Sequence, residues 1–267
     1  MIKHEVVKSM GMFKASSAAL VVKSPTKMLE WFEGTKDQQP VSAITPFSVP
    51  SLRPSFYGLA LLMVITEEGV PVDMPVYQFL YDIPQSQLGG ISFRHLATGT
   101  APAFIGPERW TSVTLMAWLV EAMSGDTVDA FLQKRVFQAM SFGSTGDWEA
   151  PPVNSDNEEI HPFYIHATDL CNWGQLFLQR GRWNDEIIVP SNVFALIDDL
   201  HKENEHSKEV LGWTVTPYGY AVTDGSGSTC AIHSTHNGVA VRLLNGCRSD
   251  QKDSFADVFA RWLQDAE

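Results

Sequence analysis

Residues 54–66 include no charged side chain, and this stretch constrains the fold more than any other part of the sequence. A helix is predicted over residues 55–68, because Gly69 and then Pro71 follow it as stop signals. A helix that is apolar on nearly all sides must be surrounded by other elements. The best uninterrupted apolar run, residues 58–65, is far too short to cross a bilayer. The sequence therefore predicts a protein built around a central buried helix.

The composition is that of an ordinary globular protein and excludes several classes of partner. The chain has 267 residues, of which 44% are hydrophobic and 19% are charged. A chain of this length buries about three-quarters of its unfolded surface, so it needs no stabilising cross-links. The net charge of −12 would repel phosphate backbones, so we expect no nucleic-acid and no membrane partner. Three scattered cysteines and an N-terminus without a signal-peptide core indicate a cytoplasmic protein.

Strands are predicted near both ends of the chain, and helices between them. A hairpin is expected over residues 16–34. Further strands are expected over the ranges 210–216, 220–223, 228–234 and 239–245, the last of them after a His236-Asn237-Gly238 turn. We expect all of them in one antiparallel β-sheet flanked by helices, which is an α+β fold of the α/β-sandwich type. The sheet region would comprise residues 1–58 and 166–267, and residues 59–165 would form a mainly helical region.

Polar residues mark where several helices are expected to begin. Ser92 is predicted to cap a short helix that ends at Leu96, and Asp126 is predicted to cap a helix over residues 128–140. Thr168 is predicted to cap a helix over residues 169–180, which Gly181 ends. Other helices are expected over the ranges 113–123, 190–200 and 254–264, and a loop over residues 142–160.

Four stretches, in this order along the chain, carry a resemblance to a known family. They are residues 47–56 (FSVPSLRPSF), residues 91–98 (ISFRHLAT), residues 110–125 with the following DAFL at 129–132, and residues 167–183. With them the chain resembles the serine β-lactamase and penicillin-binding protein superfamily, and most of all its esterase and 6-aminohexanoate-dimer-hydrolase-like branch. The resemblance extends from about residue 16 to residue 245. It implies a β-lactamase/transpeptidase-like fold, with a nucleophile at the start of the buried helix.

The resemblance also assigns positions to the three active-site motifs of the family. In Ser-x-x-Lys, Ser51 takes the nucleophile position and Pro54, which has no proton to exchange, takes that of lysine. The neighbouring Arg53 stays protonated and cannot serve as the base. Tyr-x-Asn corresponds to Trp110-Thr111-Ser112, and an indole N–H can only donate. Lys/His-x-Gly corresponds to Gly225-Ser226-Gly227, so all three motifs are expected to lack their titrating groups.

Three functions remain open after this comparison, and we favour those without hydrolysis. The first is a repurposed pocket that binds a small apolar molecule, or converts it without an acyl-enzyme, as a cyclase, lyase or isomerase of specialised metabolism would. The second is an unconventional serine hydrolase or esterase that uses Ser51. The third is a catalytically silent binding or scaffold protein.

The resemblance implies an active-site cleft, and we expect residues from distant parts of the chain to line it. Beside Ser51 as the one catalytic candidate, the predicted ligand-binding residues are Arg53, Trp110, Ser112, Ser226, Gly227, Ser228 and His233. Residues 225–228 would line the cleft as a strand, and His233 is the one strand residue that could replace the missing base. His161 and His166 lack a third convergent ligand, so no metal is expected. We expect a small-molecule ligand and no cofactor, and the sequence leaves the oligomeric state open.

Overall fold

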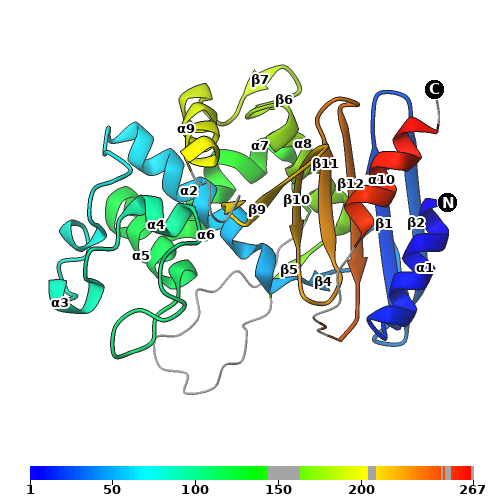
Figure 1. Cartoon of the computed structure of the whole chain (residues 1–267), viewed down its shortest axis with the longest axis horizontal. Coiled ribbons are helices and arrows are strands. Elements are labelled where there is room, and N and C mark those ends of the chain that lie inside the picture. The colour runs from blue at the N-terminus through cyan, green and yellow to red at the C-terminus, as the bar shows by residue number, and fades with distance from the viewer. Residues whose placement is uncertain (144–162, 204–208, 248, 250–253, 266–267) are drawn as a thin grey trace.

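The structure is a computed structural model of the chain, and it describes residues 1–143, 163–203, 209–247, 249 and 254–265. Within these residues the dominant feature is an antiparallel sheet of eight strands with helices on both faces (Figure 1). The predicted α+β fold is therefore confirmed. Most of the loop predicted over residues 142–160, and His161, lie outside the described residues.

The sheet joins the two ends of the chain. The strand order is β3-β2-β1-β12-β11-β10-β9-β8, and β1 pairs with β12 with Val21 opposite Val241. The strands of this sheet are β1 (Ser17–Lys23), β2 (Met28–Lys36), β3 (Gln39–Pro40), β8 (Glu209–Val210), β9 (Trp213–Thr216), β10 (Gly219–Thr223), β11 (Thr229–His233) and β12 (Gly238–Leu244). Asn237 has φ +46°, the left-handed conformation that the predicted Asn-Gly turn requires. Two short pairs complete the strands: β4 (Phe47–Ser48) with β5 (Tyr164–Ile165), and β6 (Arg182–Trp183) with β7 (Glu186–Ile187).

Most of the helices lie between the N-terminal hairpin and the C-terminal strands in the sequence. The α-helices are α1 (Ile2–Met12), α2 (Arg53–Glu67), α3 (Gln85–Leu88), α4 (Phe93–Ala97), α5 (Ser112–Ser124), α6 (Val128–Leu132), α7 (Gln138–Met140), α8 (Ala167–Leu178), α9 (Ser191–Glu203) and α10 (Phe255–Gln264). A π-helical turn, Gln133–Phe137, joins α6 to α7, so the single helix predicted over residues 128–140 is irregular in its second half.

The structure confirms one of the three predicted helix caps and contradicts the other two. Ser92 caps α4 as expected, in a capping box with His95. The cap of α6 is Thr127 rather than Asp126, because the Thr127 side chain accepts the backbone N–H of Ala130. The cap of α8 is His166, so the prediction for Thr168 is wrong and this residue lies in the first turn of the helix.

The sheet separates two hydrophobic cores. On one face, α1 and α10 pack against side chains such as Leu20 and Ala240. Helix α1 was not expected, and its buried residues Ile2, Val6 and Ser9 form a narrow stripe. On the other face, α8 lies against β1, β11 and β12, and the larger core continues into the helical region. The division into a sheet region and a helical region stays a prediction.

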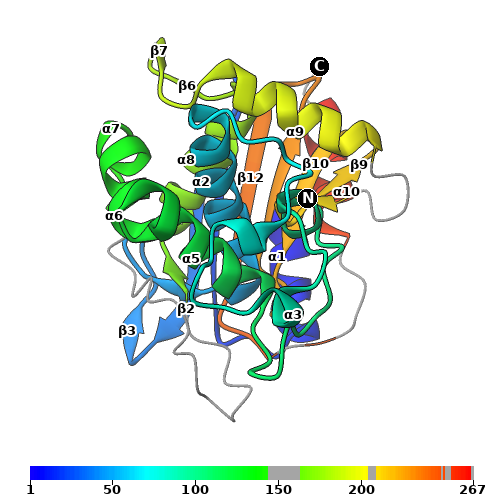
Figure 2. The ribbon, with the colours of Figure 1, turned by 90° about the vertical axis from the view of Figure 1, so that its left-hand side faces the viewer.

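The central helix α2 is buried as predicted. Every residue from Ser55 to Ile65 is buried. The helix contacts α4, α5, α6 and α9, and Figure 2 shows it in the middle of the helical side of the molecule. Among the described residues, no helix combines the length and the apolarity needed to cross a membrane.

Candidate functional site

The segment that leads into α2 is fixed by a short strand pair. β4 pairs with β5, and the amide of Val49 donates to the carbonyl of Phe163 at 2.7 Å. The next residues, Pro50–Leu52, form one 3-10 turn that leads directly into α2. Ser51 therefore lies just before the helix, where the resemblance puts a nucleophile. Backbone N–H groups at this end of a helix have no partner within the helix.

A buried carboxylate that follows strand β10 (Gly219–Thr223) accepts one of the N–H groups before the helix. Asp224, which follows β10 and is 2% exposed, accepts the backbone N–H of Ser51 with Oδ2 at 3.0 Å. Its other oxygen, Oδ1, accepts the backbone N–H of Ser226 at 2.9 Å. The negative charge is also favoured at the N-terminus of α2, where the helix dipole is positive. One side chain thus joins the start of the central helix to the edge of the β10–β11 turn.

The residues predicted to line the cleft as a strand form this turn instead. β10 ends at Thr223 and β11 begins at Thr229, so residues 225–228 connect the two strands. The prediction of a strand here is wrong, because Gly227 has φ +86°, a left-handed conformation that ends strand pairing. The fully buried Arg242 donates to the carbonyl of Gly227 through Nε at 2.9 Å and also through Nη2. Arg242 also donates through Nη1 to Ser9 Oγ of α1 at 2.7 Å, so the turn is linked to α1 as well as to Ser51.

A cavity of about 570 Å³ opens beside Ser51, a volume typical of small-molecule sites. It runs from the first turn of α2 along β9 and β10 to the first turn of α10. Its lining is Ser51, Pro54, Glu209, Gly212, Thr214, Val215, Thr216, Pro217, Ala221, Thr223, Thr229, Ala256 and Asp257. The polar side chains among them are mainly hydroxyls, and no basic side chain occurs among these residues.

Glu209 is the titratable group of this lining with a perturbed pKa. It lies on the edge strand β8, close enough to Gly99 that a Cβ on that glycine would come within 3.2 Å of Oε1. Burial raises the pKa of the Glu209 carboxyl, which favours its protonated form. A carboxyl of raised pKa in a cavity beside Ser51 is a candidate functional group. Sequence reasoning missed Glu209, because no family motif includes that position.

Several predicted ligand-binding residues lie outside the lining of this cavity. Trp110 is buried, pairs with Ile105 through backbone hydrogen bonds and packs edge-on against Trp118, at 5.5 Å between ring centroids. Ser112 is the first residue of α5. Arg53 is buried with its guanidinium over the rings of Tyr57 and Phe163, at 5.9 and 5.6 Å, and burial lowers its pKa.

The remaining predicted residues belong to the end of β11 or to the turn. His233 is the last residue of β11, at the opposite end of the strand from the turn, and it contacts the Phe259 ring of α10. The structure therefore does not bring it to Ser51 as an alternative base. Ser226 and Ser228 are buried, and Ser228 Oγ accepts the backbone N–H of Leu244 at 2.9 Å. Among the described residues, no three acidic, histidine or cysteine side chains are grouped as metal ligands.

A second serine, Ser55, lies one turn farther along in α2 and accepts two buried hydrogen bonds. Ser55 Oγ accepts the indole N–H of Trp173 and that of Trp213, both at 2.8 Å, and all three residues are buried. Ser55 lies one helical turn beyond Ser51, so this cluster ties the site to α8 and β9. The sequence offers a signal for it, since Ser55 is a polar residue at the start of an otherwise apolar helix.

Comparisons with known proteins place this architecture among solved structures. No family model matches the chain. An uncharacterised protein of Alkalihalophilus pseudofirmus is 25% identical over 266 aligned positions, covering 80% of this chain and 78% of the relative. The crystal structure of a "putative beta-lactamase" from Bacteroides dorei superposes with a TM-score of 0.76 at 13% identity, covering 99% and 97% of the two chains. A "putative 6-aminohexanoate-dimer hydrolase" from Bacillus anthracis superposes with a TM-score of 0.65 at 14% identity, covering 97% and 80%. The chain therefore has a β-lactamase-like fold, as its sequence predicted.

Proposed function

We propose that this protein binds a small molecule in the cavity beside Ser51, or converts it there, without forming an acyl-enzyme. The fold is that of serine acyl-transferring enzymes, but Pro54 and Gly225 stand where the resemblance puts lysine and a basic residue. A serine hydroxyl is a weak nucleophile until a neighbouring base takes its proton. Neither proline nor glycine can do so.

The bond between Asp224 and Ser51 is the observation that carries this proposal. Acyl transfer requires N–H donors aimed at the oxygen that becomes negative, and a helix N-terminus is a natural source of them. In this chain the amides of Ser51 and Ser226 both donate to the Asp224 carboxylate. An oxyanion at this place would lose those donors and would meet a negative charge. The arrangement supports binding without covalent catalysis.

The lining of the cavity suggests the class of ligand. Hydroxyls of Thr214, Thr216, Thr223 and Thr229 accompany two carboxyls, and the chain as a whole carries a net charge of −12. Such a surface attracts cations and repels anions. The lining therefore favours a different ligand from the apolar one expected from the sequence: a neutral or positively charged molecule that carries hydroxyl or amino groups. A carboxylate such as an opened β-lactam would be disfavoured.

Covalent labelling tests the absence of an acyl-enzyme. The protein is incubated with a fluorophosphonate and, separately, with penicillin, and intact mass is measured beside the Ser51→Ala variant. We expect no adduct and no ester or penicillin turnover, because general-base assistance alone is commonly worth about 10²–10⁴ in rate. A stoichiometric adduct that disappears in Ser51→Ala would establish the hydrolase alternative.

A second measurement tests the binding site itself. Amide chemical shifts are followed while an amino polyol such as Tris, or benzoate as the anionic comparison, is added. We expect saturable shifts of amides in β9 and β10 with Tris and none with benzoate. The affinity for Tris should be weaker in the isosteric variant Thr214→Val and unchanged in Thr35→Val, which lies on the distant strand β2. Shifts confined to other parts of the protein would contradict binding at this site, and an equal response to benzoate would contradict the expected preference for cations.

A further inference from the structure

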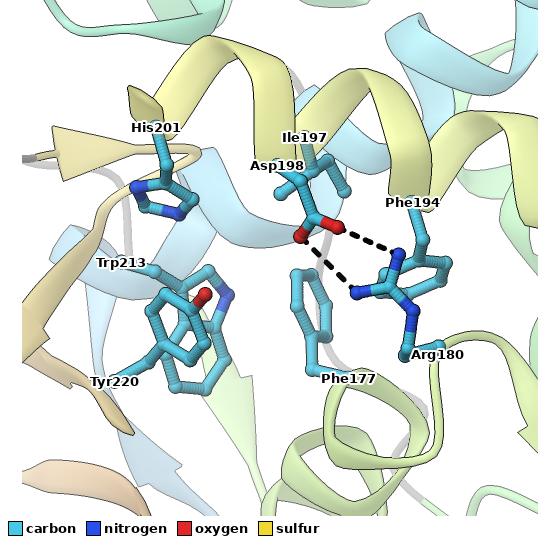
Figure 3. Close-up of a pocket in the computed structure, with 8 residues that line it drawn as sticks. All are labelled: Phe177, Arg180, Phe194, Ile197, Asp198, His201, Trp213 and Tyr220. Atoms are coloured by element: carbon cyan, nitrogen blue, oxygen red, sulfur yellow. Dashed lines mark hydrogen bonds and ion pairs between the residues drawn. The ribbon is translucent and has the colours of Figure 1, made fainter. Parts of the chain in front are cut away.

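The two faces of the outer strands β9 and β10 differ in the room that they leave for a ligand. On the face toward α8 and α9, the rings of Trp213 and Tyr220 close the space together with Phe177, whose ring centroid lies 5.0 Å from that of Trp213 (Figure 3). The volume that remains there is about 40 Å³, which is room for a few waters. Of the two spaces, the cavity of about 570 Å³ beside Ser51 is therefore the one that can take a ligand.

A row of side chains crosses the strands on the face of this larger cavity. Glu209 of β8 lies directly opposite Thr214 of β9, and Thr214 lies directly opposite Ala221 of β10. Residues opposite each other in an antiparallel pair project from the same face, with their Cβ atoms about 4.5–5.5 Å apart. All three residues line the cavity, and Thr216 lies two positions beyond Thr214 on the same face. A carboxyl and two hydroxyls are therefore neighbours in one wall.

The carboxyl of Glu209 has a defined place in this wall. Its Oε1 atom lies next to Gly99, where a Cβ would come within 3.2 Å of it, so the missing side chain makes room for the carboxyl. Burial raises the pKa of Glu209, which means that ionisation of the carboxyl costs free energy. A cation bound in the cavity would offset part of this cost. The position beside Glu209 therefore favours a positively charged group of the ligand.

We propose that the cavity takes an amino alcohol with its ammonium and hydroxyl groups on neighbouring carbon atoms, and that Glu209 is the residue that selects it. The ammonium donates to the Glu209 carboxylate, and the hydroxyl forms a hydrogen bond with the hydroxyl of Thr214. Two groups separated by three bonds can reach two side chains whose Cβ atoms are about 5 Å apart. This inference rests on the function proposed above and narrows its class of ligand.

Three molecules of nearly the same shape separate the two contacts. Tris carries an ammonium and three hydroxymethyl groups. In 1,1,1-tris(hydroxymethyl)ethane a methyl group replaces the ammonium, and in 3-ethylpentan-3-amine ethyl groups replace the hydroxymethyl groups. Each molecule is added to the intact protein at pH 7, and its affinity is taken from the amide chemical shifts of β9 and β10. We expect Tris to bind more tightly than either of the other two.

Two conservative substitutions assign the contacts to residues. Glu209→Gln keeps the shape of the side chain and removes its charge, so it should weaken Tris by about 10–100-fold, the value of a charged hydrogen bond. The affinity for the uncharged triol should change much less. Thr214→Val should weaken Tris and the triol by about 3–10-fold, the value of a neutral hydrogen bond, and leave the amine without hydroxyls unchanged. Circular dichroism shows whether each variant is folded.

Two further variants serve as controls. Glu33→Gln makes the same change at an exposed glutamate of β2 and should alter no affinity. Asp257→Asn removes another carboxyl of the cavity lining, in the first turn of α10. If this variant, and not Glu209→Gln, abolishes the preference for Tris over the triol, the assignment to Glu209 is wrong.

The remaining outcomes distinguish this inference from the function on which it rests. Equal, saturable binding of Tris and the triol to the natural protein would overturn the selection of an amino alcohol, and the proposed binding site would stand. An unchanged affinity for Tris in Glu209→Gln would have the same meaning for the role of Glu209. If none of the three molecules shifts the amides of β9 and β10 saturably, both the inference and the proposed binding site are contradicted.

Discussion

The carboxylate of Asp224 accepts the backbone N–H of Ser51 at 3.0 Å, although the two residues are 173 positions apart in the sequence. This bond joins the start of the most buried helix to the end of an outer strand. Under the proposed function, it also puts a negative charge where an acyl-transferring serine enzyme would stabilise one. The same contact therefore bears on both stability and function, and the two can be measured separately.

Replacing Asp224 should destabilise the fold. Asp224→Ala leaves the amides of Ser51 and Ser226 without their acceptor, and we expect the free energy of unfolding to fall by about 1–3 kcal/mol. Asp224→Asn retains one carbonyl oxygen and should lie between this variant and the natural protein. Urea denaturation measures the change, and Asp257→Ala, which removes a carboxyl from the cavity lining, should cost less than about 1 kcal/mol. Equal stability of Asp224→Ala and the natural protein would show that the bond contributes nothing.

The hydroxyl of Ser55 should matter more than its size suggests. Ser55→Ala leaves the indole N–H groups of Trp173 and Trp213 buried without an acceptor, and each such group costs about 1–3 kcal/mol. We expect a loss of about 2–4 kcal/mol in urea denaturation, together with altered tryptophan fluorescence. Ser86→Ala, at an exposed serine of α3, should change stability by less than about 0.5 kcal/mol. If both variants behave alike, the hydroxyl has no structural role.

Alanine substitutions at two glycines with positive φ distinguish the cost of backbone strain from the cost of a steric clash. Gly227 has φ +86°, and a Cβ there would lie 2.5 Å from ring atoms of Phe13, whereas Gly69 has φ +66° and open space around it. Gly69→Ala should lower stability by about 1 kcal/mol, from the left-handed backbone alone. Gly227→Ala should cost at least about 1 kcal/mol more, because Phe13 must also move. Thermal melts of the two variants decide the matter, and equal losses would contradict the steric argument.

Stability should decrease as the pH falls below about 6.5. Burial lowers the pKa of His233, with a further contribution from His236, and Nδ1 of His233 accepts the backbone N–H of His236 at 3.3 Å. Because the folded state resists protonation that the unfolded chain accepts near pH 6.5, acidification favours unfolding. The slope of unfolding free energy between pH 7.5 and 5.5 should be smaller in His233→Phe. His4→Gln should keep the original slope, and an unchanged slope in His233→Phe would refute the assignment.

Local patterns in the sequence were enough to predict most of the architecture. The charge-free stretch predicted α2, and the Asn237-Gly238 pair predicted the β11–β12 turn, since both signals depend on a few adjacent residues. The cap of α6 was displaced by one residue, because Asp126 and Thr127 are both good caps and only geometry decides between them. Helix α1 was missed because its buried stripe is narrow and its exposed side is highly polar.

The candidate site was harder to predict because its contacts cross the whole chain. The alignment puts Gly225 at a basic position and therefore predicts only that a cation is missing. It does not predict the carboxylate of Asp224, one residue earlier, that contacts Ser51. Trp110 and Ser112 follow Ser51 in the expected motif order, yet they lie outside the lining of its cavity. Order along the chain establishes a fold more readily than it establishes which side chains meet, because a turn such as residues 225–228 can redirect several of them at once.

The pairing of β1 with β12 has a consequence for the synthesis of the protein. Residues 17–23 leave the ribosome more than two hundred positions before residues 238–244, so the inner edge of the N-terminal hairpin stays unpaired until β12 has been synthesised. Contacts between such distant segments slow folding, and an open strand edge is prone to wrong pairing. A ribosome-stalled chain that ends before β11 should therefore be protease-sensitive in its hairpin, and release of the last residues should protect it.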